Sequence, residues 1–187
     1  IEDILIVVGY QKEAIKKHFG DSVRYAYYEN YSVTNNLHTL WSIRNELTDD
    51  VIITFADLVL NNSIINSLIA LENDFTMAID TSKILESTMR VAISKNLIKN
   101  ITTTSISEAN GNFIGIAKMN TNGCKMLINE MSGLINGNLQ DYYTIAIDQL
   151  ARKGFPVNYL DVKNFIWREI DTLDEYKEVI SIYDEFS

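Results

Sequence analysis

The sequence contains one cysteine, Cys124, one proline and two histidines among its 187 residues. A lone cysteine cannot form an internal disulfide or a cysteine cluster for structural zinc, and two histidines limit imidazole metal sites. No apolar run approaches the roughly 18 residues of a membrane span, and no basic segment followed by an apolar one predicts a signal peptide. We therefore expect a cytoplasmic protein that does not enter the membrane.

Positive charge is also scarce in this chain. Sixteen Lys and Arg face 25 Asp and Glu, which gives a formal net charge of −9. Such a chain repels the phosphate backbone of a nucleic acid, so a nucleic-acid partner is disfavoured. The hydrophobic share of 47% suits one globular core, and no linker rich in proline, glycine or serine divides the chain. We predict a single domain over residues 1–187.

Strand-like runs and helical spacing alternate through the first 80 residues. Residues 4–8 and 51–55 are almost continuously apolar and β-branched, the pattern of strands buried on both faces of a parallel sheet. Apolar residues at helical intervals follow each run, and Thr34 or Asn35 can cap one of these helices. The order predicts an α/β fold with a mostly parallel sheet and helices on its faces. Strand-like stretches between residues 75 and 118 predict a mixed or antiparallel extension of that sheet.

The end of the chain carries a helix start signal. Residues 172–175, Thr-Leu-Asp-Glu, match a capping box, which predicts the first turn of a final helix. The apolar residues of that helix form one stripe at Leu173, Tyr176, Ile180 and Tyr183.

Acidic residues stand where an α/β sheet binds ligands. Asp57 follows the strand-like run 51–55, and ligands of open α/β sheets lie beyond the carboxyl ends of strands. A carboxylate there suits Mg²⁺, although an Asp in this position equally caps a turn or a helix. Glu169 and Asp171 lie two residues apart near a short predicted strand, so their side chains share one side and could provide the second anionic group. Asp171 alone could instead simply favour the helix dipole beside Thr172.

Four segments, in this order, resemble the landmarks of the nucleotidyltransferases. The nearest branch is that of the CTP:phosphocholine and phosphonate cytidylyltransferases, relatives of the sugar-1-phosphate nucleotidyltransferases. The landmarks extend over nearly the whole chain, so the resemblance concerns an architecture more than one short motif. The segments are Tyr31-Ser-Val-Thr-Asn-Asn-Leu-His-Thr-Leu-Trp41, Val51-Ile-Ile-Thr-Phe-Ala-Asp57, Gly111-Asn-Phe-Ile-Gly-Ile-Ala-Lys118 and Trp167-Arg-Glu-Ile-Asp-Thr172.

The resemblance implies a Rossmann-like domain of the nucleotide-diphospho-sugar transferase type. It implies transfer of a nucleotidyl group, with CTP the favoured donor, to phosphocholine, aminoethylphosphonate or a sugar 1-phosphate, with release of pyrophosphate. By this correspondence Asp57 matches the metal-binding Asp after the central strand, and Asp171, with Glu169, matches the terminal acidic motif that shares the Mg²⁺. The other expected partners are a second copy of the chain or a fused domain.

Acceptor binding is expected from residues near the same edge. An ammonium group would be held by ring faces and a carboxylate, for which Trp167 and Asp80 are candidates. Asn35 and Asn36 could donate to a base or to the acceptor from the start of a helix, or they could simply cap it; we favour substrate binding because two consecutive Asn follow a Tyr-rich loop. Trp41 has the helical spacing of a packing residue.

The chain departs from the family pattern in its glycines. The family carries a G-x-G-x-R loop after its first strand, and none of the eight glycines here forms one. We therefore expect the first βα unit to be missing, a segment to precede Ile1, and the chain by itself to lack activity. A non-catalytic relative that binds a nucleotide or a partner stays open as an alternative. A nucleotide-sugar glycosyltransferase is a further alternative, but it would usually show Asp-x-Asp where this chain has Asp57-Leu-Val.

Overall fold

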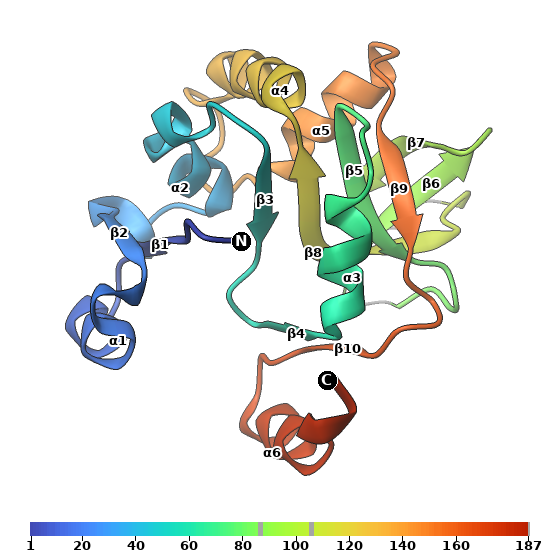
Figure 1. Cartoon of the computed structure of the whole chain (residues 1–187). Helices are drawn as coiled ribbons and strands as arrows, with labels where there is room; N and C mark the ends of the chain where they lie inside the picture. Colours follow the sequence, from blue (N-terminus) through green and yellow to red (C-terminus); the bar gives the residue numbers. More distant parts are fainter. Residues whose placement is uncertain (86–87, 105–106, 187) are drawn as a thin grey trace.

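The computed structural model describes residues 1–85, 88–104 and 107–186 (Figure 1). Strands and helices alternate up to residue 80, except that two strands follow each other at residues 51–60. A run of strands then leads to the helices of residues 121–152. In chain order the elements are β1 (Leu5–Val8), α1 (Lys12–Phe19), η1 (Gly20–Ser22), β2 (Arg24–Tyr27), η2 (Glu29–Ser32), α2 (Asn36–Ser42), η3 (Arg44–Glu46), β3 (Val51–Thr54), β4 (Leu58–Leu60), α3 (Asn62–Ile69), β5 (Phe75–Asp80), β6 (Met89–Ser94), β7 (Leu97–Thr102), β8 (Gly111–Met119), α4 (Thr121–Leu134), α5 (Thr144–Arg152), β9 (Asn158–Asp161), β10 (Trp167–Glu169), α6 (Leu173–Ser181) and η4 (Tyr183–Phe186), where η marks a short 3₁₀ helix.

The central sheet is built around β8. Its strand order is β7-β6-β8-β5-β9, and β3 pairs with β8 as well. β8 runs antiparallel to β3, β5 and β6, while β9 runs parallel to β5. Those four partners therefore share one direction, and the carboxyl ends of β3, β5 and β9 lie at the same edge. The expected mixed sheet, with an antiparallel extension after residue 75, is confirmed.

Helices cover both faces of this sheet (Figure 1). Because successive side chains of a strand point to opposite faces, Ala117 of β8 faces one core cluster and Ile116 faces another. The larger cluster contains buried residues of α2, α4 and α5, and the smaller one contains Ile64 and Leu68 of α3. All nine residues of β8 and all six of β5 are buried, which explains their nearly continuous apolar sequences.

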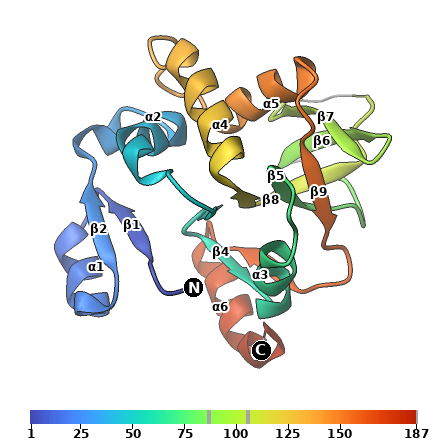
Figure 2. The same cartoon turned by 45° about the horizontal axis from the view of Figure 1, so that its top comes forward.

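The first strands form a separate small sheet. β1 pairs with β2 in parallel, and within the described ranges neither strand is paired with β3. Figure 2 shows this unit, with α1, to one side of the central sheet. The expectation that residues 4–8 are buried on both faces is therefore wrong: Val8 alone is buried, since β1 has one neighbouring strand and α1 buries no residue. Arg24 forms a 2.8 Å ion pair with Asp3 inside this unit, and a second 2.8 Å ion pair with Glu46 links the unit to the rest of the chain.

A two-stranded ribbon crosses the carboxyl edge of the central sheet. β4 pairs with β10 in antiparallel register, and α6 lies beyond this ribbon (Figure 1). The predicted capping box at the start of α6 is confirmed. The apolar stripe at Leu173, Tyr176, Ile180 and Tyr183 is exposed, and Val179 is the one residue of α6 that is buried.

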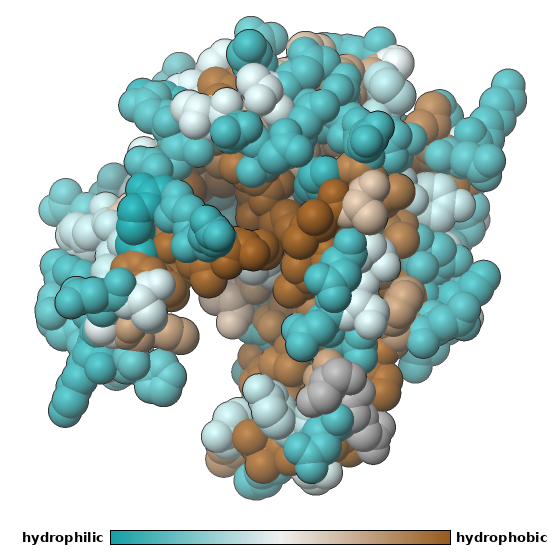
Figure 3. Space-filling model, viewed as in Figure 1, coloured by the Kyte–Doolittle hydropathy of each residue, from teal (hydrophilic) through white to brown (hydrophobic). Residues whose placement is uncertain are grey.

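Apolar side chains are also visible on the outside of the fold. In Figure 3 they gather near the centre of the face, between the helices above and the β1–β2 unit at the left. Two strands contribute half-buried apolar residues. These are the first three residues of β1 and Val51, Ile52 and Ile53 of β3. None of the helices in the described ranges is long and apolar enough to span a lipid bilayer.

Candidate active site

Asp57 lies where the chain leaves the central sheet. β3 ends at Thr54, residues 56 and 57 form a turn, and β4 begins at Leu58. The amide of Phe55 still donates to the carbonyl oxygen of Gly115 in β8, over 2.9 Å. Asp57 therefore directly precedes β4, and its side chain is exposed at the carboxyl edge.

The ribbon of β4 and β10 brings Asp57 beside the terminal acidic residues. Leu58 lies opposite Glu169, and the amide of Ile170 donates to the carbonyl oxygen of Asp57 over 2.9 Å. Asp171 follows directly and is exposed. Two segments that are far apart in the sequence thus place three carboxylates, those of Asp57, Glu169 and Asp171, around one short ribbon.

These carboxylates influence one another electrostatically. Burial, and after it the negative charges of Asp57, Asp171 and Glu175, together raise the pKa of Glu169 to about 7. The carboxylates of Asp57 and Asp171 take part in no hydrogen bond or ion pair within residues 1–85, 88–104 and 107–186. The site therefore holds excess negative charge with exposed oxygens, which is the chemistry of a cation site.

The backbone that carries Asp171 is held by the start of α6. One carboxylate oxygen of Glu175 accepts from the amide of Asp171 at 2.9 Å and from the amide of Thr172 at 2.7 Å. The Thr172 hydroxyl donates to the same oxygen, and these hydrogen bonds lower the pKa of Glu175. Glu175 stays ionised as a result, and it fixes the main chain at Asp171. The sequence pattern identified Glu175 as a capping residue but not as a neighbour of Glu169.

Asp80 and Trp167 contact each other. The indole N–H of Trp167 donates to one carboxylate oxygen of Asp80 at 3.0 Å, and the amide of Ser82 donates to the other at 2.7 Å. Asp80 is buried at the end of β5, and Trp167 is half-buried on β10. The carboxylate of Asp80 therefore holds the orientation of the Trp167 ring, and the indole is the more accessible of the two candidates.

Asn35 and Asn36 are engaged in the local fold. Asn35 is the N-cap of α2, as predicted, and its side-chain oxygen accepts from the amide of Asn36 at 2.7 Å. The side-chain oxygen of Asn36 accepts from the amide of Tyr143 at 2.8 Å, which ties the start of α2 to the start of α5. The structure thus gives the side-chain oxygens of both residues capping and bridging roles.

The carboxylates of this site suit a Mg²⁺ ion that is shared between protein and substrate, and they do not suit an ion enclosed by protein ligands alone. Within the part of the chain that the structure describes, no group of three or more His, Cys, Asp or Glu is arranged to hold a metal ion. The predicted trio of Asp57, Glu169 and Asp171 is therefore no closed protein cage. Mg²⁺ usually keeps several waters and takes one or two carboxylates plus substrate phosphates, a pattern that two exposed aspartates satisfy.

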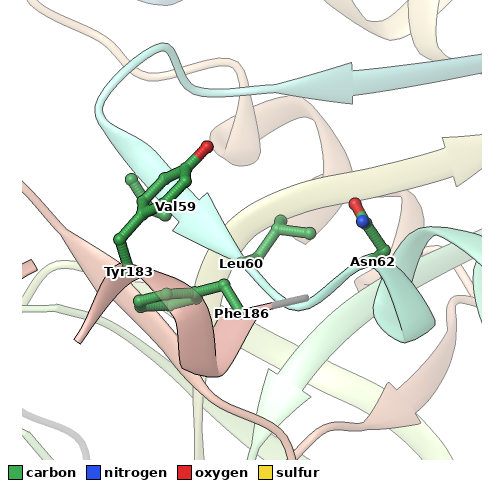
Figure 4. A pocket seen from close by; sticks show the side chains of 5 residues that line it. All are labelled: Val59, Leu60, Asn62, Tyr183 and Phe186. Atoms are coloured by element: carbon green, nitrogen blue, oxygen red, sulfur yellow. The ribbon is translucent and has the colours of Figure 1, made fainter. Parts of the chain in front are cut away.

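A small pocket lies on another part of the ribbon. Figure 4 shows its lining, Val59, Leu60, Asn62, Tyr183 and Phe186, from β4, α3 and η4. This lining holds aliphatic and aromatic side chains and one amide, without the charged groups that a triphosphate requires. The acidic edge at Asp57 is therefore the better candidate for phosphate chemistry.

No family model matches this chain. No curated protein matches it either. Several solved structures match it in fold. The inositol-1-phosphate CTP transferase from T. maritima is 16% identical with a TM-score of 0.77, and the match covers all of this chain and 77% of that one. The CTP:phosphocholine cytidylyltransferase from Streptococcus pneumoniae is 20% identical with a TM-score of 0.76, over 98% of this chain and 79% of that one.

A third match is a protein from Bacillus anthracis assigned as a glucose-1-phosphate thymidylyltransferase, solved in complex with sucrose. It is 12% identical with a TM-score of 0.78, over 97% of this chain and 76% of that one. At these identities the likeness establishes the fold. The expected nucleotidyltransferase-like architecture is confirmed, although the sequence identity to these proteins is low.

Proposed function

We propose that this chain forms the core of an enzyme that transfers a nucleotidyl group from a nucleoside triphosphate to a phosphate or phosphonate acceptor, releasing pyrophosphate. The observation that carries the proposal is the juxtaposition of Asp57 and Asp171, both exposed, across the β4–β10 ribbon. The nucleotidyltransferase fold of the chain supports it, because in this type of sheet ligands bind beyond the carboxyl ends of the strands.

Each acidic residue has a distinct task in this proposal. In-line attack on the α-phosphorus builds negative charge on its oxygens, and a bound Mg²⁺ would neutralise that charge. Asp57 and Asp171 would hold the ion from opposite strands of the ribbon, and the Glu175 cap would keep Asp171 in place. Glu169, whose raised pKa of about 7 leaves it partly protonated in the metal-free site, would add its negative charge once a bound cation displaced that proton. The acceptor oxygen is already anionic, so no protein nucleophile is required.

CTP is the proposed donor because two solved proteins with this fold, the inositol-1-phosphate CTP transferase and the CTP:phosphocholine cytidylyltransferase, are named for it. The acceptor is phosphocholine, aminoethylphosphonate or a sugar 1-phosphate. The half-buried indole of Trp167 lies two residues before Glu169, where its ring face could meet an ammonium group. Asp80 would contribute through its hold on that indole. Asn35 would contribute by capping α2, and Asn36 by joining the start of α2 to the start of α5.

The test is a pyrophosphate-release screen on the full-length protein with Mg²⁺. Four nucleoside triphosphates are each combined with phosphocholine, aminoethylphosphonate and several sugar 1-phosphates. We expect turnover with one acceptor class and with CTP. Asp57→Asn and Asp171→Asn should abolish it, whereas Asp174→Asn should not, because Asp174 is an exposed α6 residue that pairs with Lys177.

Two results would contradict the proposal. Turnover at the wild-type rate in both Asp57→Asn and Asp171→Asn would reject the metal assignment. Binding of CTP without pyrophosphate release from any combination would instead support the non-catalytic alternative, which the lack of a G-x-G-x-R loop within these 187 residues favours.

A further inference from the structure

β8 changes partners at Gly115. On one side it pairs with β3 from Met119 down to Ile116, and below this point β6 takes over at Phe113. On the other side, residues 114–116 of β8 lie opposite the single residue Ala78 of β5. The strand is therefore bulged where β3 departs toward Asp57 and β4 (Figure 1).

Two observations explain why residue 115, at the bulge, is a glycine. Its φ is +95°, a backbone conformation that side chains other than glycine rarely adopt. A Cβ atom on Gly115 would also lie 2.8 Å from Cδ2 of Phe55, which is too close for an unchanged structure. The ring of Phe55 thus occupies the space that a side chain at residue 115 would need.

Phe55 is half-buried, and two further rings pack against it. It packs edge to face against Phe113 at 5.9 Å between centroids and against Tyr143 at 6.1 Å. Tyr143 is 1% exposed, and its hydroxyl has no hydrogen-bond partner within the described ranges. A buried hydroxyl without a partner carries a free-energy cost. The favourable contribution of Tyr143 at this place is therefore the packing of its ring. Phe55 is therefore clamped between one backbone and two rings, only two residues before Asp57.

We propose that Gly115 is a positioning residue: through Phe55 it sets the direction in which β3 leaves the sheet and thereby the place of Asp57. Asp57 gains its importance from the nucleotidyl transfer proposed above, and to that extent the inference rests on it. The placement itself does not depend on a bound metal, so it can be tested separately.

The test compares Gly115→Ala with Gly154→Ala in the 187-residue chain. Gly154 also has a positive φ, +89°, but a Cβ there would meet nothing within 4 Å. Both variants impose backbone strain, and Gly115→Ala alone collides with Phe55. Two quantities are measured: the amide ¹H–¹⁵N chemical shifts without metal, and the affinity for Mn²⁺ in the presence of CTP.

We expect Gly115→Ala to move the amide signals of residues 55–58 and to weaken Mn²⁺ binding by roughly 10-fold or more, the usual cost of disturbing a residue that orients a metal ligand. Gly154→Ala should move only signals near residue 154 and bind Mn²⁺ within twofold of wild type. Phe55→Ala should reproduce the shifts and the weaker binding of Gly115→Ala.

Unchanged signals at residues 55–58 in Gly115→Ala would overturn the positioning role, whatever the metal affinity. An equal loss of Mn²⁺ affinity in both glycine variants would also overturn it, because strain alone would then explain the loss. A different result identifies failure of the proposed function: the signals move as expected, but Asp57→Asn binds Mn²⁺ as tightly as wild type.

Discussion

The indole N–H of Trp167 donates to the carboxylate of Asp80 over 3.0 Å, and this hydrogen bond ties β10 to the end of β5. Asn112 of β8 holds the same corner, because its side-chain nitrogen donates to the carbonyl oxygen of Asp80. The acidic ribbon is thus attached to the central sheet by specific hydrogen bonds as well as by apolar packing. Glu169 lies two residues beyond this attachment.

Removal of the indole donor should destabilise the fold. In Trp167→Phe the buried Asp80 carboxylate keeps, among the residues that the structure describes, only the Ser82 amide as a donor. This loss should cost about 1–3 kcal/mol of the free energy of unfolding. Urea unfolding measures this loss. Trp41→Phe is the matched control, since no hydrogen bond of the Trp41 indole N–H is present in the described ranges, and its loss should be smaller. Equal losses in the two variants would show that the Trp167–Asp80 bond adds nothing to stability.

The raised pKa of Glu169 gives the metal-free protein a characteristic pH dependence. Its ordinary pKa of 4.5 rises to about 7 in the folded protein, so the folded state holds the proton more tightly than the unfolded chain does. The stability that this group contributes is full below pH 4.5 and is lost as the pH rises through about 7. In the wild-type protein this group should lower the free energy of unfolding by about 2–3 kcal/mol between pH 4.5 and a pH above 7. Glu169→Gln should lack this decrease.

Urea unfolding of wild type and Glu169→Gln at several pH values between 4.5 and 8 isolates this contribution, because every other titrating group is common to both proteins. Glu178→Gln is a suitable control on α6, where Glu178 is exposed and pairs with Arg168. Parallel stability curves for wild type and Glu169→Gln would mean that Glu169 titrates as an ordinary exposed carboxyl.

Two glycines of α4 should respond in opposite directions to the same substitution. A Cβ on Gly123 would overlap the carbonyl oxygen of Asp74, whereas a Cβ on Gly133 would meet nothing within 4 Å. Gly123→Ala should therefore cost about 1–3 kcal/mol or more, by overpacking. Gly133→Ala should stabilise the helix by about 0.5–1 kcal/mol, since alanine has the higher helix propensity. Thermal unfolding of both variants checks the signs, and a loss of stability in Gly133→Ala would contradict the open surroundings of that residue.

The sequence predicted the elements whose signals are local and strong. The run 51–55 matches the bounds of β3 to within one residue, because five apolar or β-branched residues in succession suit a strand. The expectation that this strand is buried on both faces is wrong: within the described ranges β3 has one neighbouring strand, β8, and none of its four residues is buried. The cap at Asn35 and the capping box at Thr172 follow from side chains that bond to their own helix. Strand β4 was missed, since three residues after a turn carry too little pattern to distinguish a strand from a loop.

The relation between the acidic residues required the tertiary structure. The spacing of the sequence indicated that Asp57 ends a strand and that Glu169 and Asp171 share one side, but it could not reveal that β4 pairs with β10. That pairing is non-local, so no sequence period reports it. The separation of the β1–β2 unit from β3 was missed for the same reason, because apolar runs do not show which strand is the neighbour.

In the proposed function, Asp57 and Asp171 together hold one divalent ion at the edge of the sheet. Paramagnetic broadening of backbone amide signals by substoichiometric Mn²⁺, in the presence of CTP, locates such an ion. We expect the signals of residues 56–58 and 169–172 to broaden first, and we expect the double variant Asp57→Asn/Asp171→Asn to abolish this broadening while its other signals stay in place. Broadening centred on other acidic residues, such as the exposed Asp49 and Asp50, or broadening that persists in the double variant, would contradict a shared ion at this edge.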